Sequence, residues 1–93
     1  MLQVSFSRQA EKFLLNIFPK HAKQIARKIM ELRINPRPSD SKKLKEKKSS
    51  LYYMRSDIGE YRIIYRVEDN VLIIFVIGKR NDDAVYKVFK RKV

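Results

Sequence analysis

The chain has 93 residues, of which 44% are hydrophobic and 34% charged, so we expect one small globular domain over residues 1–93. Its net charge of +12 and its pI of about 10.2 indicate a polyanionic partner, either a nucleic acid or an acidic protein. Cysteine is absent and histidine occurs once, which excludes a disulfide framework, a thiolate zinc site and a multi-histidine metal site. No apolar run approaches the roughly 20 residues that span a bilayer. The first residues also lack a signal-peptide pattern, so we expect a cytoplasmic protein without a metal or cofactor.

The first third of the chain predicts a strand and two helices. Leu2, Val4 and Phe6 alternate with polar residues, which is typical of a half-buried strand. Ser7 is a suitable N-cap for a helix, and Pro19 ends that helix or begins the next. Apolar residues at helical spacing then define the inner faces: Ala10, Phe13, Leu14 and Ile17 on the first helix, and Ala22, Ile25, Ala26, Ile29, Met30 and Leu32 on the second. The short turn between them predicts an antiparallel helical hairpin.

Residues 35–40 contain two prolines and predict a loop, which leads into a basic segment at residues 42–50. Runs of lysine are usually solvated or mobile. In the alternative interpretation, Leu44 anchors this segment on the core and holds its lysines at a fixed rim.

The second half predicts three strands, at residues 51–56, 60–67 and 71–77, with turns at residues 57–59 and 69–70. The last strand is apolar at every position, which indicates a central strand covered on both faces. Asn81 can cap a final helix that has Asp82 and Asp83 at its positive end. The order is β-α-α-β-β-β-α. The expected fold is therefore an α+β domain in which the helical hairpin packs on a mainly antiparallel four-stranded sheet.

Hairpin register determines which polar residues share a face. If Asp57 and Ile58 form the first turn, Arg55 pairs with Glu60 and Tyr53 pairs with Arg62. One face then carries Tyr53, Arg55, Arg62 and Arg66, and the core face carries Tyr61, Ile63, Tyr65 and Val67.

Arginine and tyrosine at these positions point to RNA, because guanidinium groups bind phosphate and aromatic rings stack on bases. RNA cleavage by its own 2′-hydroxyl requires alignment, a base, an acid and cations that stabilise the phosphorane, without a metal. This region offers no histidine and no obvious carboxylate base, and arginine stays protonated. A lysine of residues 42–48, where neighbouring charges favour the neutral amine, is the better base. We therefore expect a poor stand-alone nuclease that depends on a partner to position its RNA.

Two simpler interpretations remain open for the same residues. Tyr86 is equally compatible with a core position on the last helix, beside Val85 and Phe89. The strand arginines are equally compatible with a surface charge ladder, in which Arg62 and Arg66 pair with nearby glutamates.

The chain resembles the RelE/ParE superfamily of toxins from bacterial and archaeal toxin–antitoxin pairs over nearly its whole length. The resemblance rests on the helical opening from Phe6 to Leu14 and on four short motifs: Lys43-Leu44-Lys45, Gly59-Glu60-Tyr61-Arg62-Ile63-Ile64-Tyr65, Gly78-Lys79-Arg80 and Asp83-Ala84-Val85-Tyr86. It is most similar to the RelE branch. That branch implies a ribosome-dependent mRNA endonuclease, or mRNA interferase, which cuts in the A site and inhibits translation, together with a cognate RelB-like antitoxin that blocks it.

The resemblance also implies roles for individual residues. Arg62 would stabilise the transition state, Arg80 would act as the acid or contact phosphate, and Tyr86 would stack on or orient the substrate. Two basic residues of the branch, spaced by one, are matched here by Tyr53 and Arg55; Arg55 thus replaces the expected base with a group that hardly deprotonates. The catalytic candidates are Arg55, Arg62, Arg80 and Tyr86, and the candidate RNA contacts are Lys42, Lys43, Lys45, Lys47, Lys48, Tyr53, Arg66 and Lys79.

Other functions are compatible with the same sequence. A ParE-like toxin would inhibit DNA gyrase and lack this nuclease set; the combination of Arg62, Arg80 and Tyr86 favours the RelE branch. A plain RNA- or DNA-binding module, or an inactive homologue that acts only through its antitoxin, belongs to a different class. Such a module would lose affinity gradually with each lysine or arginine removed.

Overall fold

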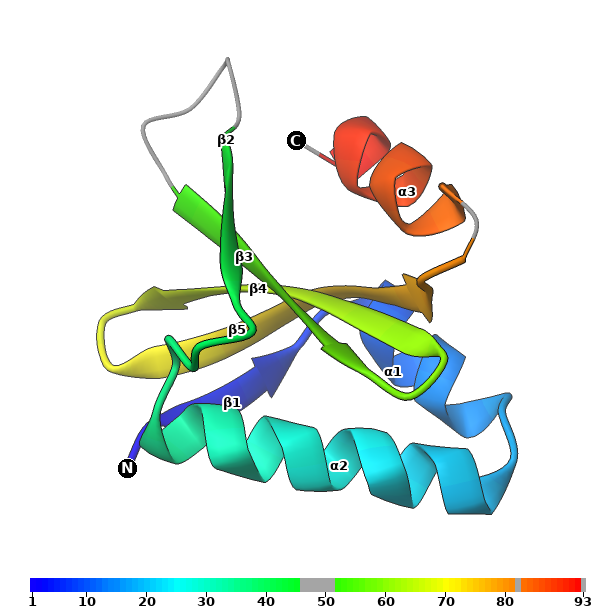
Figure 1. Ribbon diagram of the computed structural model, residues 1–93, viewed down its shortest axis with the longest axis horizontal. Helices are drawn as coiled ribbons and strands as arrows, with labels where there is room; N and C mark the ends of the chain where they lie inside the picture. Colours follow the sequence, from blue (N-terminus) through cyan, green and yellow to red (C-terminus); the bar gives the residue numbers. More distant parts are fainter. Residues whose placement is uncertain (46–51, 82, 93) are drawn as a thin grey trace.

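The computed structural model describes residues 1–45, 52–81 and 83–92, which form three helices and a five-stranded sheet (Figure 1). In chain order the elements are β1 (Gln3–Phe6), α1 (Arg8–Leu15), α2 (Pro19–Ile34), β2 (Lys42–Lys45), β3 (Tyr52–Ile58), β4 (Tyr61–Glu68), β5 (Val71–Lys79) and α3 (Ala84–Lys92). The strands lie in the order β1-β5-β4-β3-β2. β1 is parallel to β5, and the other neighbouring strands are antiparallel. The predicted α+β class and element order are confirmed, with β2 as an additional strand.

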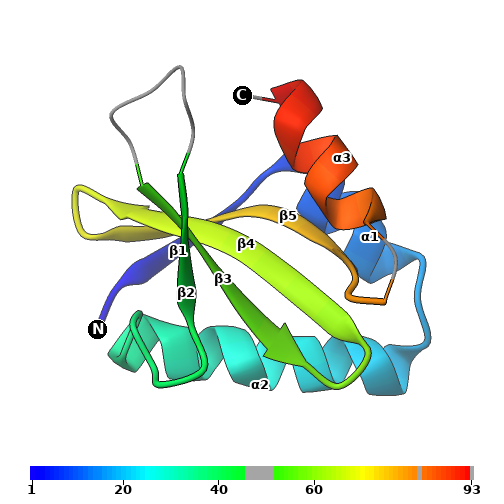
Figure 2. The same ribbon diagram turned by 45° about the horizontal axis from the view of Figure 1, so that its top comes forward.

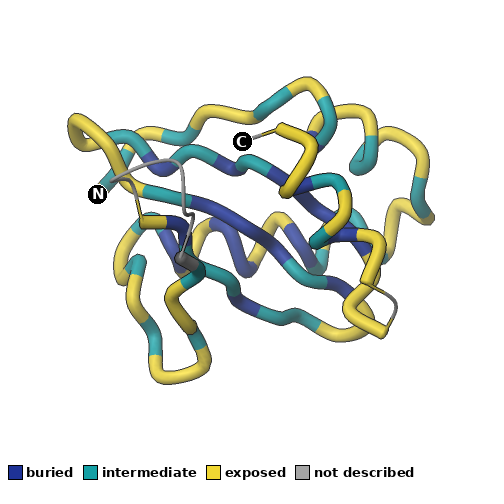
Figure 3. Tube along the Cα trace, turned by 90° about the horizontal axis from the view of Figure 1, so that it is seen from above, coloured by how far each residue is buried: buried dark blue, intermediate teal, exposed yellow. Residues whose placement is uncertain are grey.

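Helices cover the sheet on both faces, so it has two hydrophobic cores. α1 and α2 pack on one face and α3 on the other (Figures 1 and 2). The larger core joins Ala10, Ile25, Ile29, Leu32, Tyr61, Ile63, Tyr65, Leu72, Ile74 and Ile77. The smaller core joins Tyr53, Ile64, Val76, Val85 and Phe89. β5 contributes to both cores, as its apolar sequence predicts, and the buried residues follow the middle of the sheet in Figure 3.

The predicted helix starts are confirmed for α1 and α2. The Oγ of Ser7 accepts a hydrogen bond from the amide of Ala10 at 3.1 Å, which satisfies one of the free N–H groups of the first turn. Pro19 occupies the first turn of α2, where its missing N–H costs nothing. Both helices therefore begin where local chemistry requires it.

The predicted inner face of α2 is wrong at two positions. Ala26 and Met30 are exposed, while Lys28, expected on the outer face, is buried. The Nζ of Lys28 donates to Asp40 at 3.0 Å, and the hydroxyl of Ser56 donates to the same carboxylate oxygen at 2.8 Å. A charged residue is tolerated inside because it has a partner that lies in the loop after the helix.

The basic segment begins as a strand rather than as a solvated run. β2 pairs with β3 in antiparallel register, and Leu44 packs against the smaller core opposite Tyr53. The interpretation in which Leu44 anchors the segment is confirmed for residues 42–45. Lys47 and Lys48 lie outside the described residues.

The predicted register of the β3–β4 hairpin is wrong, but the predicted faces are right for Tyr61, Ile63 and Tyr65. Val67, predicted for the core, is 45% exposed because it lies near the end of β4. Asp57 pairs with Arg62 and Arg55 pairs with Ile64, because β3 continues to Ile58 and the turn is Gly59-Glu60. Gly59 adopts a φ of 56° at the first position of this two-residue turn, a conformation for which glycine is preferred. The error moved each partner by an even number of residues, and strand side chains alternate with a period of two. The second predicted turn, Asp69-Asn70, is confirmed, with positive φ at both residues.

The final helix begins later than predicted. α3 starts at Ala84, and the amides of Tyr86 and Lys87 donate to the carbonyl of Asp83. Asn81 therefore precedes the helix and is not its cap, while Asp82 lies outside the described residues.

Candidate active site

A cluster of polar and charged residues surrounds Arg62 on the sheet face that α3 covers, close to the β3–β4 turn. The Nε of Arg62 donates to Oδ1 of Asp57 at 2.7 Å, and Nη2 donates to Oδ2 at 3.1 Å. Its Nη1 donates to the hydroxyl of Tyr86 at 2.6 Å. The guanidinium also lies over the Tyr86 ring, 5.3 Å from its centroid. Arg62 is thereby fixed from two sides, by a strand neighbour and by a residue of α3.

Arg80 completes the cluster from the end of β5. Its Nη1 lies 3.9 Å from Oδ2 of Asp57, and its side chain is 48% exposed. Its backbone amide donates to the carbonyl of Glu60, which ties the loop after β5 to the β3–β4 turn. Arg80 is thus a cation with a fixed backbone and a side chain open to an incoming anion. The cluster formed by Asp57, Arg62, Arg80 and Tyr86 is called the arginine cluster below.

The charges of the arginine cluster reinforce one another. Hydrogen bonds from Arg62 lower the pKa of Asp57. Burial opposes this shift, and the positive charges of Arg62, Arg55 and Arg80 add to it. The Asp57 carboxylate in turn raises the pKa of Arg62, so the guanidinium stays charged at any pH the protein meets. Sequence reasoning expected no carboxylate here and placed Asp57 in the turn. A carboxylate is present, yet its lowered pKa makes it a poor proton acceptor.

The predicted catalytic residues are therefore largely brought together. Arg62, Arg80 and Tyr86 meet at Asp57 although they are distant in sequence. Arg55 lies two residues before Asp57 on β3, and its Cα partner across the sheet edge is Lys42. Tyr86 packs partly buried against the smaller core, and its hydroxyl accepts a hydrogen bond from Arg62. Its role toward a substrate stays a prediction.

The predicted RNA contacts are more dispersed. Tyr53 is only 4% exposed and packs edge-on against Phe89, so its ring is part of the core and is not an open stacking surface. Arg66 forms an ion pair with Glu68 at 3.0 Å and donates to the Tyr53 hydroxyl, which matches the charge-ladder interpretation for this residue. The remaining described candidates lie at separate places: Lys42 opposite Arg55, Lys43 over the ring of Tyr52, Lys45 opposite Tyr52 along the backbone, and Lys79 at the exposed end of β5.

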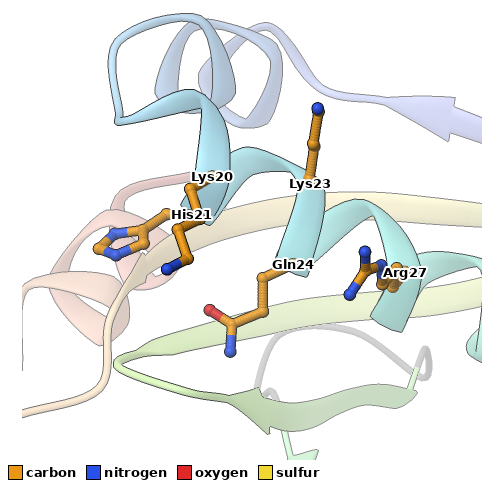
Figure 4. A pocket seen from close by; sticks show the side chains of 5 residues that line it. All are labelled: Lys20, His21, Lys23, Gln24 and Arg27. Atoms are coloured by element: carbon orange, nitrogen blue, oxygen red, sulfur yellow. The ribbon is translucent and has the colours of Figure 1, made fainter.

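A second basic region lies on the far side of the sheet, along α2. Lys20, Lys23 and Arg27 line a pocket there together with His21 and Gln24, and Figure 4 shows Gln24 pointing toward the β3–β4 hairpin. His21 hydrogen-bonds through Nδ1 to the Tyr61 hydroxyl at 2.7 Å. This histidine therefore has a structural partner in the larger core.

Comparison with known proteins identifies the family. The profile described as "ParE toxin of type II toxin-antitoxin system, parDE" matches residues 4–84. The chain belongs to this toxin family. The predicted resemblance to the RelE/ParE superfamily is thereby confirmed. A search of curated proteins gives no match.

Solved structures of RelE toxins share the fold of this ParE-family chain. The toxin in the archaeal RelE–RelB complex from Pyrococcus horikoshii OT3 has a TM-score of 0.73 and 27% identity, covering 85% of this chain and 94% of that one. The RelBE2 toxin–antitoxin complex from Mycobacterium tuberculosis matches with a TM-score of 0.70 and 21% identity, covering 85% of this chain and 98% of that one. The isolated E. coli RelE toxin matches with a TM-score of 0.61 and 21% identity, and the match covers 100% of both chains.

In the described residues, no helix of this toxin-family chain is long and apolar enough to cross a membrane. Within the same residues, no group of three or more histidine, cysteine or acidic side chains is placed to hold a metal ion.

Proposed function

We propose that this chain is a RelE-like toxin that cuts mRNA in the ribosomal A site and so stops translation. The observation that carries the proposal is the arginine cluster, in which Arg62 is fixed by Asp57 and Tyr86 while Arg80 remains half-exposed beside them. A preorganised cation next to a second, half-exposed cation suits a phosphate that gains charge during reaction.

The proposed reaction is attack by the 2′-oxygen of the RNA on its own phosphorus. The bond from O2′ to phosphorus forms, the bond from phosphorus to O5′ breaks, and a 2′,3′-cyclic phosphate remains. Arg62 and Arg80 stabilise the charge of the phosphorane, and Arg80 contacts the leaving side or donates its proton to O5′. Tyr86 orients the nucleotide through its ring. These steps depend more on the correct positioning of the RNA than on the chemical reactivity of the side chains.

The base that takes the 2′-hydroxyl proton is the weakest part of this set. Arg55 stays protonated, and Asp57 is tied to Arg62. We assign the role to Lys42, because β2 holds it directly across from Arg55 on the face of the arginine cluster. The absence of a histidine from the arginine cluster favours dependence on the ribosome, which would align the mRNA and compensate for a poor base.

The proposed partners follow from charge and from the family. A net charge of +12 favours ribosomal RNA as a docking surface and an acidic or amphipathic antitoxin as an inhibitor. The Pyrococcus relative was solved with RelB, and we propose a RelB-like antitoxin for this chain, with both proteins in the cytoplasm where ribosomes are. The antitoxin should sharply lower non-specific RNA binding; a complex that binds RNA as tightly as the free toxin contradicts this.

A second candidate function is supported by the family profile itself, which is described as ParE. In this alternative the chain inhibits DNA gyrase and the arginine cluster has a structural role. A catalytically inactive homologue that only binds nucleic acid is the third possibility, favoured by the presence of Tyr53 and Arg55 where the RelE branch has basic residues, one of them the expected base.

Primer extension on a reporter mRNA, translated in a purified system, tests the proposal. We expect cuts at fixed positions within codons that disappear without ribosomes and in Arg80→Ala. Arg27→Ala is the matched control, because it removes one exposed arginine from the opposite side of the sheet. Arg62→Ala tests the second cation in the same assay.

The outcomes separate the three functions. Cuts that persist in Arg62→Ala and Arg80→Ala contradict the proposed mechanism. Unaffected translation without cuts rejects the ribosomal function, and a gyrase supercoiling assay then decides between the ParE-like and the inactive alternatives. A plain binding module would instead lose RNA affinity by similar amounts in all three variants.

A further inference from the structure

The largest exposed aromatic side chain outside the arginine cluster and the α1–α2 turn is Tyr52, at the start of β3. Its side chain is 61% exposed, unlike that of its neighbour Tyr53. It lines a pocket between the loop that follows α2 and strands β2, β3 and β4. Here β2 pairs with β3 and forms the edge of the sheet (Figure 2). Because the exposed ring of Tyr52 does not contribute to the core, the residues around it indicate which kind of ligand it could contact.

The surroundings of Tyr52 are cationic with an apolar floor. Arg37, Lys43 and Arg66 line the pocket around the ring, and Met54 and Val67 supply its apolar surface. The Nζ of Lys43 lies 5.0 Å from the centroid of the Tyr52 ring. Among the described residues, Arg66 has an acidic partner in Glu68, whereas no ion pair involves Arg37 or Lys43. Within the described part of the chain, two cations without an ion pair therefore flank an accessible aromatic ring.

We propose that this pocket is a stacking site for a base of single-stranded RNA, with Tyr52 as the platform and Arg37 and Lys43 as phosphate contacts. A nucleotide uses both the flat ring and the charges beside it. An acidic peptide would use the charges and leave the ring face without a matching group. None of the described residues that line the pocket is acidic, and the nearby carboxylate of Glu68 is paired with Arg66.

The pocket and the arginine cluster are connected around the edge of the sheet by β2. Lys42 pairs with Arg55 and lies on the face of the arginine cluster, while Lys43 pairs with Met54 and lies on the face of the pocket. Tyr52 and Asp57 are five residues apart on β3, a separation of roughly 17 Å along a strand. An RNA strand bound at both places would therefore pass over the edge strand and place several nucleotides between the stacked base and the cut. The inference takes RNA as the ligand from the proposed function but does not require cleavage.

Fluorescence anisotropy with a labelled ten-nucleotide single-stranded RNA, in the absence of ribosomes, tests this site. Tyr52→Leu keeps apolar bulk and removes the ring, and we expect it to weaken binding roughly five- to 100-fold. Tyr52→Phe keeps the ring and should stay within about twofold of the unmodified chain. The same oligonucleotide with abasic positions should bind the unmodified chain and Tyr52→Leu equally. Thermal unfolding of each variant verifies folding.

Charge variants complete the test. Lys43→Ala should lower the salt dependence of binding by about one counterion without removing the base dependence. Equal binding by Tyr52→Leu and the unmodified chain, with Lys43→Ala and Arg27→Ala weakened alike, overturns the site in favour of diffuse electrostatic attraction. Unchanged RNA binding with lost antitoxin binding in Tyr52→Leu overturns it in favour of a protein contact.

The same variants distinguish failure of the site from failure of the proposed function. If the unmodified chain gives no ribosomal cuts but binds RNA through the ring, the nuclease proposal fails and the stacking site stands. If the unmodified chain cuts mRNA and Tyr52→Leu binds and cuts as well as it does, the stacking site fails and the nuclease proposal stands.

Discussion

Arg62 and Asp57, which are direct Cα partners across the β3–β4 hairpin, form an ion pair with two parallel contacts of 2.7 and 3.1 Å. The pair consumes the Nε donor and one Nη2 donor of the guanidinium, and the Tyr86 hydroxyl takes a third donor. Two N–H groups of Arg62 remain for a substrate, one on each terminal nitrogen. Asp57 therefore determines the direction in which Arg62 presents its remaining donors.

Asp57→Asn is expected to reduce cleavage without reducing RNA binding. The amide keeps the size of the side chain but offers one acceptor oxygen, so Arg62 loses its two-point contact and its fixed orientation. If Arg62 acts in the proposed reaction, cleavage should fall roughly 10- to 100-fold, because small misplacements of a group at the reacting phosphate are costly. RNA affinity should rise slightly, since the net charge increases by one.

Glu60→Gln is the matched control for Asp57→Asn. It removes one negative charge from the neighbouring turn, where the Glu60 side chain is exposed and makes no ion pair with Arg62. Equal loss of cleavage in the two variants would contradict a positioning role for Asp57 and point to overall charge instead. Both are measured by ribosomal primer extension and by anisotropy with the same RNA.

Tyr86 has two separable functions, because its hydroxyl binds Arg62 and its ring lies beside the guanidinium. Tyr86→Phe removes only the hydroxyl, and we expect a stability loss of about 1 kcal/mol. If the ring orients the nucleotide, Tyr86→Phe should retain most cleavage and Tyr86→Ala should lose it. Loss of activity to the same extent in both variants would show that the hydroxyl, not the ring, is needed. Chemical denaturation separates these effects from unfolding.

Gly78 controls how closely α3 approaches the sheet. A Cβ at this position would lie 3.1 Å from the Cβ of Val85, the residue before Tyr86. Gly78→Ala should therefore displace α3 and cost about 1–3 kcal/mol of stability. The loss of cleavage should exceed what partial unfolding alone explains, because Tyr86 moves away from Arg62. Val85→Gly removes the contacting Cβ, so a Gly78→Ala/Val85→Gly double variant that regains activity would confirm the steric cause. An active, fully stable Gly78→Ala variant would contradict it.

Most of the fold can be predicted from the sequence, because strand alternation, the spacing of apolar residues on helices, helix caps and turns are all local patterns. The assignment of Tyr61, Ile63 and Tyr65 to one face survived a wrong register, since an even shift preserves side-chain direction. The meeting of Arg62, Arg80 and Tyr86 was predicted only through family resemblance. The role of Asp57 was missed, although an aspartate five residues before an arginine across a Gly turn is a signal for a cross-strand ion pair.

Other features depend on tertiary contacts that no local pattern reveals. As a lysine, Lys28 is predicted to lie on the surface. It is buried because Asp40, twelve residues later in the chain, lies beside it. Tyr53 reads as a surface aromatic on a cationic face, and it is covered because Phe75 and Phe89 pack on its ring. Strand β2 reads as a solvated run, and Leu44 and its pairing with β3 override that tendency.

The Lys28–Asp40–Ser56 network links stability to pH. Burial disfavours the charged form of Asp40, but hydrogen bonds from Lys28 and Ser56 outweigh it, so the pKa of Asp40 is lowered. The pKa of Asp57 is lowered as well, through Arg62. A carboxyl whose pKa is lower in the folded than in the unfolded state stabilises the fold above its unfolded pKa of about 4. The free energy of unfolding should therefore be constant near neutrality and fall as the pH drops below about 5.

Asp40→Asn should decrease the free energy of unfolding at neutral pH by about 1–3 kcal/mol. It removes the closer anionic partner of the Lys28 ammonium, which is 9% exposed as a residue, and leaves, among the described residues, only Glu31 at 3.9 Å. Lys28→Met should cost less, since it replaces the buried charge by an apolar chain of similar length while Asp40 remains partly solvated. The decline below pH 5 should be smaller in Asp40→Asn than in the unmodified chain, because one of the two carboxyls with lowered pKa is gone. Urea unfolding between pH 3 and 8 measures all three quantities. A larger loss in Lys28→Met than in Asp40→Asn would mean that the ion pair itself, and not the stranded buried charge, dominates this network.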